Sequence, residues 1–478
     1  MMRSDTGSGT ILEDASALGA VRRRLSPSQI AWLAGLAIAA VALGVISPKI
    51  PWYAVVLIFH LAFLVCAVWR IALIVVAVHA PPDEPAREPT TWPRYTILAA
   101  LYDEAEVADQ LVARLAEIEY PPDRLEAFLL LEAHDLETLD AVLATDMPDW
   151  MHVVVVPPGS PGTKPRALNH GLALATGDLV VVYDAEDDPD PYQLQEAALR
   201  FVDDDGGRLA CLQAPLRIRT GRAGAVGGFV QRQFAVEYAA LFEVTLPAMS
   251  RLGMPFPLGG TSNHFRADVL RRVGGWDAYN VTEDADLGFR LWRHGWRLGV
   301  LRSPTYEAAP QGVDVWLPQR TRWLKGFMQT WGVHTRNLIG LGWRGVTALF
   351  MTLGLALASA ALFAVTLALV CMSLILSLAA QVPPSAGFVS FSVLISGVAA
   401  AWIQSAVGAR RAQVPYSAAD MALAPIYWSM LSLAFVHAVW RLIREPHAWD
   451  KTPHLRDAGQ DDDDAADLGP QAAGRQAA

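Results

Sequence analysis

Cysteine is scarce in this sequence, and positive charge is not in excess. The 478 residues include three cysteines, Cys66, Cys211 and Cys371, which lie far apart and show no metal-ligand spacing. We therefore expect free thiols and reducing surroundings. The formal net charge is −10, which argues against a nucleic-acid partner, because neutralising phosphates requires a basic face.

Long uncharged runs are what the sequence has in excess. It is 53% hydrophobic and 18% charged, which is too apolar for an ordinary soluble protein, so membrane segments must hold the excess. The runs Ile30–Ile46 and Pro51–Trp69 predict two transmembrane helices within residues 26–80. The arginines at 22–24 place the N-terminal segment 1–25 in the cytoplasm. Arg70 would then mark the cytoplasmic end of the second helix, where it can snorkel into the interface.

The apolar character returns over residues 343–443. As a single helix, Gly345–Val382 would be about 57 Å long, against a hydrocarbon core of ~30 Å. It is therefore either a hairpin of two helices or an interfacial helix that leads into one span. Gly387–Val407 and Met421–Leu442 are two further spans, so this region holds three or four helices.

The end of the chain, residues 444–478, begins with a polar, aromatic segment and finishes in a tail that includes the acidic run Asp461–Asp464. We expect the tail to be disordered. If the polar segment faces the central domain, an even number of crossings precedes it, which favours the hairpin and six helices in all. Six helices put Arg410 and Arg411 on the outer side, where they fit poorly.

Residues 94–340 have the pattern of a soluble α/β domain. Short apolar strand candidates alternate with helical patterns, which indicates a largely parallel sheet covered on both faces. Ligands of such sheets bind beyond the carboxyl ends of the strands. The strand candidates are Tyr95–Leu101, Phe128–Glu132, Val153–Pro157, Leu179–Tyr183 and Leu209–Gln213, and the helical ones include Asp103–Ile118, Pro165–Ala175 and Pro191–Val202.

Polar residues follow several of these strands. Asp135, after the second strand, is either the N-cap of the next helix or a hydrogen-bond partner of a nucleobase or ribose. Lys164 and Arg166 lie in the first turn of a helix, where cations oppose the helix dipole. An anionic ligand such as a diphosphate would remove that conflict. The alternative is a solvated basic turn.

An acidic cluster follows the buried strand Leu179–Tyr183. Asp184 and Glu186 are spaced so that both can reach one divalent cation, and Mg²⁺ sites typically combine one or two carboxylates with substrate phosphates. Five acids within residues 184–190 would repel one another without a cation or a basic partner. We interpret the cluster as a metal site, the alternative being an acidic solvated loop.

Two further stretches lie towards the end of the α/β domain. Thr282-Glu283-Asp284 precedes a helical pattern; it is either a capped, dipole-stabilised helix start or the site of a general base. Gln319-Arg-Thr-Arg322-Trp323 is either an amphipathic interfacial helix or a phosphate-binding arginine beside an aromatic sugar platform.

These motifs, taken in order, resemble the membrane-embedded family 2 glycosyltransferases, which include cellulose synthase, hyaluronan synthase and bacterial exopolysaccharide synthases. The resemblance rests on Asp135, Asp184-Ala-Glu186, Thr282-Glu283-Asp284 and Gln319-x-x-Arg322-Trp323, and covers about residues 95–330. It implies a GT-A (Rossmann-like) α/β catalytic domain combined with an α-helical transmembrane domain, as a multi-pass protein of the bacterial inner membrane with a cytoplasmic catalytic domain.

The resemblance also implies a nucleotide-diphosphate sugar as donor, most simply a UDP-sugar. Asp135 and Lys164 would bind this donor, and Asp184 and Glu186 would hold Mg²⁺ or Mn²⁺ on its diphosphate. The family's usual Asp-x-Asp is Asp-x-Glu here, which leaves open whether Glu186 or Asp187 is the second metal contact. Asp284 would be the general base of an inverting transfer that makes a β-linkage, and Arg322 would stabilise the departing nucleotide.

On the acceptor side, the resemblance implies a loop at Gly259–Asn263 and a gating-like segment at Trp449–His454. The acceptor would be a growing glycan, or alternatively a lipid-linked molecule that receives one sugar. Membrane lipid and export proteins are further expected partners. A transporter or membrane receptor with a nucleotide-binding domain is a non-catalytic alternative, although the apolar runs hold few ionisable residues. The expected acceptor-binding residues are Gly260, Thr261, Ser262, Glu283, Gln319 and Trp323.

Overall fold

The computed structural model describes residues 26–47, 49–79, 91–220, 225–381 and 387–448. Its α/β domain is built on a seven-stranded sheet of order β3-β2-β1-β4-β8-β6-β9. Strand β8 runs antiparallel to β4 and β6, and the other neighbouring pairs are parallel. The prediction of a largely parallel sheet is therefore confirmed. The bounds are Tyr95–Leu101 (β1), Leu125–Glu132 (β2), Met151–Val156 (β3), Leu179–Tyr183 (β4), Leu209–Gln213 (β6), Asn263–Arg266 (β8) and Arg297–Val300 (β9).

Helices cover both faces of this sheet because successive strand residues point to opposite sides. Ile97 of β1 belongs to one core cluster, which includes Leu111 of a covering helix. The next residue, Leu98, belongs to the cluster on the other face, which includes Leu168. All four side chains are buried, and each such burial contributes about 1.5–3 kcal/mol. The helices of the domain are α4 (Ala108–Ala116), α5 (Leu136–Leu143), α6 (Lys164–Leu174), α7 (Gln193–Val202), α10 (Ala267–Arg272) and α11 (Glu283–Arg293).

A second sheet of three short strands lies beside the first, with the order β5-β10-β7. It consists of Asp188–Pro189 (β5), Thr305–Ala308 (β10) and Leu216–Arg219 (β7). Sequence patterns did not predict these strands. Strand β5 lies within the acidic cluster that follows β4, so the second sheet extends from that edge of the domain.

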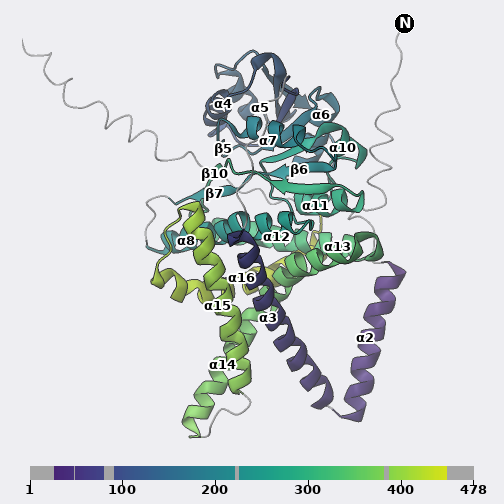
Figure 1. Ribbon diagram of the computed structural model, residues 1–478, viewed down its shortest axis with the longest axis vertical. Helices are drawn as coiled ribbons and strands as arrows, with labels where there is room; N and C mark the ends of the chain where they lie inside the picture. The colour runs from purple at the N-terminus through teal and green to yellow at the C-terminus, as the bar shows by residue number, and fades with distance from the viewer. Residues whose placement is uncertain (1–25, 48, 80–90, 221–224, 382–386, 449–478) are drawn as a thin grey trace, which may run out of the picture.

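Helices α8 (Ala225–Ala240) and α12 (Val313–His334) lie between the α/β domain and the apolar helices below it (Figure 1). Helix α8 spans Ala225–Ala240 and continues through a π-helical turn, Leu241–Thr245, into α9, Leu246–Arg251. Helix α12 spans Val313–His334 and contains the Gln319–Trp323 stretch. Among the residues described, these helices connect the sheet to the apolar part of the chain.

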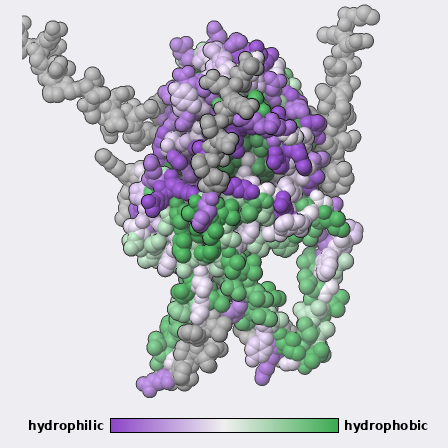
Figure 2. Space-filling model, viewed as in Figure 1, coloured by the Kyte–Doolittle hydropathy of each residue, from purple (hydrophilic) through white to green (hydrophobic). Residues whose placement is uncertain are grey.

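Five helices are long and apolar enough to cross a membrane, counting only the described residues. Figure 2 shows their apolar surfaces below the polar α/β domain. The membrane segments predicted from composition are thus present as helices. Their bounds are Pro27–Ile46 (α2), Lys49–Val78 (α3), Leu355–Ala379 (α14, preceded by α13, Gly342–Leu349, and a π-helical turn, Phe350–Gly354), Gly387–Ala412 (α15) and Ala418–Arg444 (α16).

Two expectations about these helices are wrong. The favoured hairpin within Gly345–Val382 is absent from the described residues of that run, because residues 342–379 follow one another as α13, a π-helical turn and α14 without a reversal. Arg70 does not end its helix, because α3 continues to Val78. Arg70 Nη1 instead donates to Gln404 Oε1 of α15 at 2.6 Å, so it ties two apolar helices together.

Helix α16 lies along the base of the α/β domain, although its composition suits a membrane span. Near its first turn, Asp420 accepts a hydrogen bond from Arg232 of α8 at 2.8 Å. Just beyond its last turn, the carbonyl of Ala448 accepts from Lys325 of α12 at 2.7 Å. The two ends of α16 therefore contact α8 and α12.

Helix α14 runs away from the α/β domain and α15 runs back towards it (Figure 1), so these two helices together return the chain to the side on which the domain lies. Arg411, near the end of α15, donates to the carbonyl oxygens of Glu243 at 2.9 Å and Ala77 at 2.8 Å. The expectation that Arg410 and Arg411 lie on the outer side is therefore wrong. His447 contacts the carbonyl of Tyr279 at 3.0 Å, so the polar segment faces the α/β domain as expected. Trp449–His454, the acidic tail and the N-terminal segment 1–25 lie outside the described residues.

One glycine of α12 tests how closely this helix packs on α11. A Cβ added at Gly326 would lie 2.4 Å from Cγ2 and Oγ1 of Thr282, whereas one added at Gly332 would meet nothing within 4 Å. Alanine normally stabilises a helix interior by up to about 1 kcal/mol over glycine. We predict that Gly326→Ala lowers the thermal unfolding midpoint in detergent, because overpacking costs about 1–3 kcal/mol.

Gly332→Ala is the matched control in the same helix and should leave the midpoint unchanged or raise it. Equal midpoints for the two variants would contradict the close contact between Gly326 and Thr282.

Candidate active site

Most of the predicted site residues meet at the carboxyl edge of β4. Lys164, in the first turn of α6, donates from Nζ to Asp184 Oδ1 and, at 2.8 Å, to the carbonyl of Gly260. Burial acts to lower the pKa of Lys164, but the charges of Asp184 and Glu283 outweigh it and raise that pKa. The cation that opposes the dipole of α6 is thus held by carboxylates from two other elements.

The turn after β4 is shaped by Asp187. Its Oδ2 accepts a hydrogen bond from the backbone N–H of Asp184 at 2.7 Å and another from the hydroxyl of Thr261. Burial, together with the charges of Asp184 and Glu186, raises the pKa of Asp187 well above its usual value. Because Asp187 is committed to the turn, Glu186 is better placed to act with Asp184 towards a ligand.

This cluster suits a cation that is shared with a substrate. Asp187 Oδ1 is buried and has no hydrogen-bond partner among the described residues, so a nearby positive charge would offset its repulsion from Asp184 and Glu186. Within the described ranges, no group of three or more His, Cys, Asp or Glu side chains is arranged to hold a metal ion. Two carboxylates completed by substrate phosphates are typical of Mg²⁺ sites. The residues therefore fit the predicted metal.

The loop Gly259–Asn263 leads into β8 and is fixed from both sides. Gln213 at the end of β6 accepts from the N–H of Gly259 at 2.7 Å and donates to the carbonyl of Thr261 at 3.0 Å. Ser262 has a positive φ of 55°, and its N–H donates to the carbonyl of Val182 at 2.7 Å. A Cβ added at Gly260 would lie 3.5 Å from Asp284 Oδ2. The loop therefore lies directly against the start of α11.

Glu283 and Asp284 open α11 in buried surroundings. Burial raises the pKa of Asp284 to about 6, opposed by a hydrogen bond from the N–H of Ala285 and by the charges of Lys164 and Arg322. Burial and the charge of Asp284 raise the pKa of Glu283 to about 8. A carboxyl group with a pKa near neutrality is suited to proton transfer.

The neighbouring residues of α11 have structural contacts. Thr282 occupies the predicted N-cap position, but its side chain makes no capping hydrogen bond. Asp286 accepts from Arg290 Nε at 3.1 Å and contacts His334 Nε2 of α12 at 3.0 Å. His334 Nδ1 accepts in turn from Arg293 Nε at 3.0 Å. This buried network fastens α11 to α12.

Helix α12 supplies the remaining predicted side chains. The charge of Arg322 acts to lower the pKa of both Glu283 and Asp284, against the larger effect of burial. Trp323 packs against Phe234 and Tyr238 of α8, with ring centroids 6.1 Å apart in each pair. Gln319 Oε1 is buried and has no hydrogen-bond partner within the described part of the chain.

Asp135 lies apart from this cluster. It is the N-cap of α5, accepting from the N–H of Thr138 at 3.2 Å, and it also accepts from the N–H of Asp103 at 2.5 Å. The helix-capping interpretation is therefore confirmed, and a ligand role remains a prediction. Its strand, β2, is separated from β4 by β1. Two strand spacings amount to about 10 Å, a span that a nucleotide can bridge.

Sequence analysis missed two residues near the acidic cluster. Glu307 of β10 is half-buried, and burial together with the charges of Asp187, Glu186 and Asp184 raises its pKa well above the usual value. Burial and the charge of Glu307 also raise the pKa of Tyr238. Both residues reach the site through pairings and packing distant in the sequence, so no local motif marks them.

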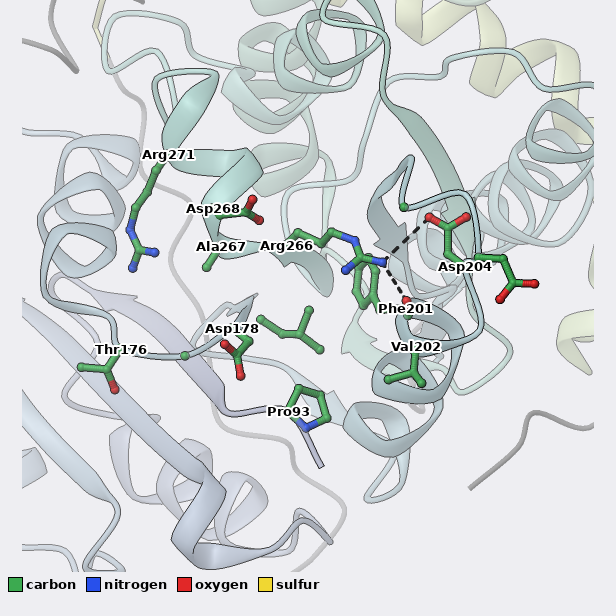
Figure 3. Close-up of a pocket in the computed structure, with 14 residues that line it drawn as sticks. Pro93, Thr176, Asp178, Phe201, Val202, Asp204, Arg266, Ala267, Asp268 and Arg271 are labelled. Carbon is green, nitrogen blue, oxygen red and sulfur yellow. Dashed lines mark hydrogen bonds and ion pairs between the residues drawn. The ribbon is translucent and has the colours of Figure 1, made fainter. Parts of the chain in front are cut away.

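A cavity of about 660 Å³ lies elsewhere, at the amino edge of the sheet. Figure 3 shows Asp178 at the start of β4 and Arg266 at the end of the antiparallel β8, with Arg266 directed at Asp204. Arg266 donates to the carbonyl of Phe201 at 2.7 Å. This cavity lies at the amino edge of the sheet, whereas the predicted residues lie at the carboxyl edge, so it is not the candidate site.

A solved mannosyltransferase, PcManGT from Pyrobaculum calidifontis in complex with GDP-Man and Mn²⁺, aligns with a TM-score of 0.51 at 18% identity, over 80% of this chain and 99% of that one. The predicted GT-A α/β fold with apolar helices is thereby confirmed. The profile described as "Glycosyl transferase family group 2" matches residues 179–443, and the chain belongs to this family.

Curated relatives with enzymatic names also match. The β-monoglucosyldiacylglycerol synthase of Synechocystis sp. is 27% identical over 267 residues, which is 54% of this chain and 53% of that protein. The cellulose synthase 1 catalytic subunit of Komagataeibacter xylinus is 26% identical over 266 residues, or 54% of this chain and 34% of the subunit. The chain spans about half the length or less of these two relatives.

The buried network of Asp286 can be tested against an exposed pair of the same spacing. Asp286→Ala leaves the buried guanidinium of Arg290 without its carboxylate, and breaking such a pair costs about 3–5 kcal/mol. We predict a clear loss of thermal stability in detergent, measured by circular dichroism.

Asp268→Ala is the control, because Asp268 and Arg272 form an exposed pair at 2.7 Å with the same i, i+4 spacing. Exposed pairs contribute about 0–1 kcal/mol. Similar losses in the two variants would show that burial of Asp286 does not matter.

Proposed function

We propose that this chain is an inverting β-glycosyltransferase that moves a sugar from a nucleotide-diphosphate donor, most simply a UDP-sugar, to a hydroxyl group of an acceptor at the membrane. The observation that carries the proposal is the position of Asp284. Its carboxyl group has a pKa of about 6 and lies beside Gly260, whose carbonyl binds Lys164 next to Asp184. A proton acceptor and a phosphate-binding group thus occupy the same edge of the sheet.

The donor would extend along this edge from Asp135 to Lys164. Asp135 binds the nucleoside end, and the ammonium group of Lys164 meets the diphosphate, which replaces Asp184 as its counter-charge. Asp184 and Glu186 would hold Mg²⁺ or Mn²⁺, which when bound would supply positive charge beside the diphosphate. The partnerless oxygen of Asp187 supports a cation at this turn.

In the transfer step, Asp284 accepts the proton of the acceptor hydroxyl. The acceptor oxygen forms a bond to the anomeric carbon while the bond from that carbon to the diphosphate oxygen breaks. The nucleoside diphosphate leaves with that electron pair, and Arg322 and Lys164 stabilise its charge. Attack from the side opposite to the leaving group inverts the anomeric centre, so an α-linked donor gives a β-linked product.

The acceptor would lie between the loop Gly260–Ser262 and helix α12. Trp323 offers an aromatic face to a sugar ring, and the partnerless Gln319 Oε1 can accept a hydrogen bond from a hydroxyl group. Glu283 lies at the same end of α11. Helices α8 and α12 also pack against the apolar helices α15 and α16, so the acceptor approaches from the membrane side.

Two acceptors fit this arrangement. The leading candidate is a growing polysaccharide or glycan, exported with the help of membrane helices and partner proteins. The second is a lipid-linked molecule that receives one sugar, which the contact of α8 and α12 with the apolar helices favours. Purified protein with radiolabelled donor separates them: a ladder or high-molecular-weight product on a gel supports extension, whereas a single lipid-soluble product supports one addition.

The membrane arrangement that we propose has four crossings, made by α2, α3, α14 and α15, with α16 at the surface. The arginines at 22–24 place the N-terminus and the catalytic domain in the cytoplasm of a bacterial cell, at the inner membrane. An even number of crossings on each side of the α/β domain keeps both ends of the chain on that side.

The donor can be identified by a screen of UDP-sugars and GDP-mannose for nucleotide release, with and without Mg²⁺ or Mn²⁺. Release from one UDP-sugar that depends on the metal supports the proposal. Release from no nucleotide sugar would exclude it.

Replacing the proposed base should separate binding from chemistry. Asp284→Asn removes the proton acceptor but keeps the shape of the side chain, so transfer should fall by about 10²–10⁴-fold. UDP binding, measured by calorimetry, should stay within about twofold, because the donor contacts are intact. Asp268→Asn, on the exposed face of α10, is the control. Near wild-type turnover of Asp284→Asn would overturn the assignment.

The pH dependence follows from the raised pKa of Asp284. The base acts as a carboxylate, which predominates above its pKa of about 6. We predict that kcat/KM falls as the pH drops through about 6, by tenfold per pH unit below it. Initial rates measured from about pH 5 to pH 8 test this. An acid limb near the ordinary carboxyl pKa of 3.8 would contradict the effect of burial.

A further inference from the structure

Arg320 of α12 is buried. It follows Gln319 and precedes Trp323 in the sequence, but it is not one of the residues expected to bind the acceptor. Its guanidinium group forms two parallel hydrogen bonds to Glu237 of α8, at 2.9 Å and 2.6 Å. The side chain of Arg320 is 6% exposed. A guanidinium fork on a carboxylate is geometrically specific as well as strong, so this pair fixes the orientation of Arg320 relative to α8.

The same guanidinium lies over the ring of Trp323. The distance from Arg320 Cζ to the centroid of Trp323 is 4.5 Å, and to the centroid of Phe234 it is 4.8 Å. Both are within the range of cation–π attraction, which amounts to about 2 kcal/mol or more when the groups are desolvated. The guanidinium group of Arg320 therefore contacts the ring of Trp323 while its hydrogen bonds to Glu237 fix its own orientation.

The hydroxyl of Tyr427 in α16 completes the arrangement. It donates to Glu237 Oε2 at 2.8 Å and accepts from Arg320 Nη2 at 3.0 Å and from Trp316 Nε1 at 3.0 Å. Tyr427 is buried. One hydroxyl therefore joins α16 to the ion pair between α8 and α12.

We propose that Arg320 is a positioning residue that sets the plane of Trp323, and that Tyr427 of α16 maintains this setting from the membrane side. The proposal rests on the function proposed above, in which Trp323 receives the acceptor. Lysine cannot replace Arg320, because an ammonium group can neither form the bidentate pair with Glu237 nor stack a planar group on the indole ring. A shift of α16 at Tyr427 would consequently reorient the acceptor platform.

The orientation of Trp323 can be observed directly by ¹⁹F NMR on full-length protein in nanodiscs, labelled with 5-fluorotryptophan. The Trp323→Phe variant assigns its resonance. In Arg320→Lys and in Tyr427→Phe, the Trp323 resonance should shift or split, because its charged neighbour is lost or released. Resonances other than those of Trp316 and Trp323 should stay in place, which shows that the fold is kept.

Arg232→Lys is the matched control. Arg232 also joins α8 to α16, through Asp420 at 2.8 Å, but it has no recorded contact with Trp323. Its substitution should leave the Trp323 resonance unchanged. An unchanged Trp323 resonance in Arg320→Lys and Tyr427→Phe would overturn the proposal, as would an equal shift in Arg232→Lys.

A kinetic readout separates positioning from folding. With the UDP-sugar found in the donor screen, water competes with the acceptor for the sugar. The ratio of sugar transferred to the acceptor to UDP released should therefore fall about tenfold or more in Arg320→Lys, because a misplaced acceptor reacts slowly while hydrolysis of the donor continues. The donor KM should stay within about twofold. An unchanged ratio would overturn the role in transfer. Absence of UDP release by the wild-type protein would instead refute the proposed function and leave the NMR result standing.

Discussion

The site depends on the balance of charge at one edge of the sheet. The charges of Asp184 and Glu186 raise the pKa of Asp187 and that of Glu307, and Lys164, in the first turn of α6, opposes this effect at Glu307. Lys164 donates to Asp184 Oδ1, and the hydroxyl of Thr261 and the N–H of Asp184 both donate to Asp187 Oδ2, so two oxygens of the cluster are satisfied. Buried like charges of this kind require partners from outside their own strand. The α6 start, the Gly259–Asn263 loop and the turn after β4 therefore have to come together.

The sequence predicts the donor half of the domain well because its signals are local. Tyr95–Leu101 and Leu179–Tyr183 are continuous buried strands with exact bounds in the structure, and Asp184 follows the second of them directly. The second sheet escapes prediction because its strands have two to four residues, too few for a periodic pattern. The position of Glu307 near the acidic turn therefore cannot be predicted from the sequence, because it depends on the pairing of β10 with β5.

The membrane region shows a different limit of sequence analysis. Apolar composition predicts that a helix avoids water, but it does not say whether the helix crosses the bilayer or lies on its surface. Helix α16 has the composition of a span, yet contacts at Asp420 and Ala448 hold both ends against the α/β domain. The polar partners that decide its direction, Arg232 and Lys325, are far away in the sequence. The favoured hairpin is wrong because residues 342–379 continue as one helical run, and His447 of the polar segment reaches the α/β domain without it.

The reversed direction of β8 has a consequence for how this site divides its tasks. Parallel strands bring their last residues to the carboxyl edge, whereas an antiparallel strand brings its first. Gly259–Ser262 therefore reach that edge as the end of the excursion through α8, the π-helical turn and α9, and not as the continuation of a donor-binding strand. In the proposed function, insertions or exchanges within that excursion would remodel the acceptor wall while the strands beneath the nucleotide keep their register. The two proposed substrate specificities would then lie on separable segments of the chain.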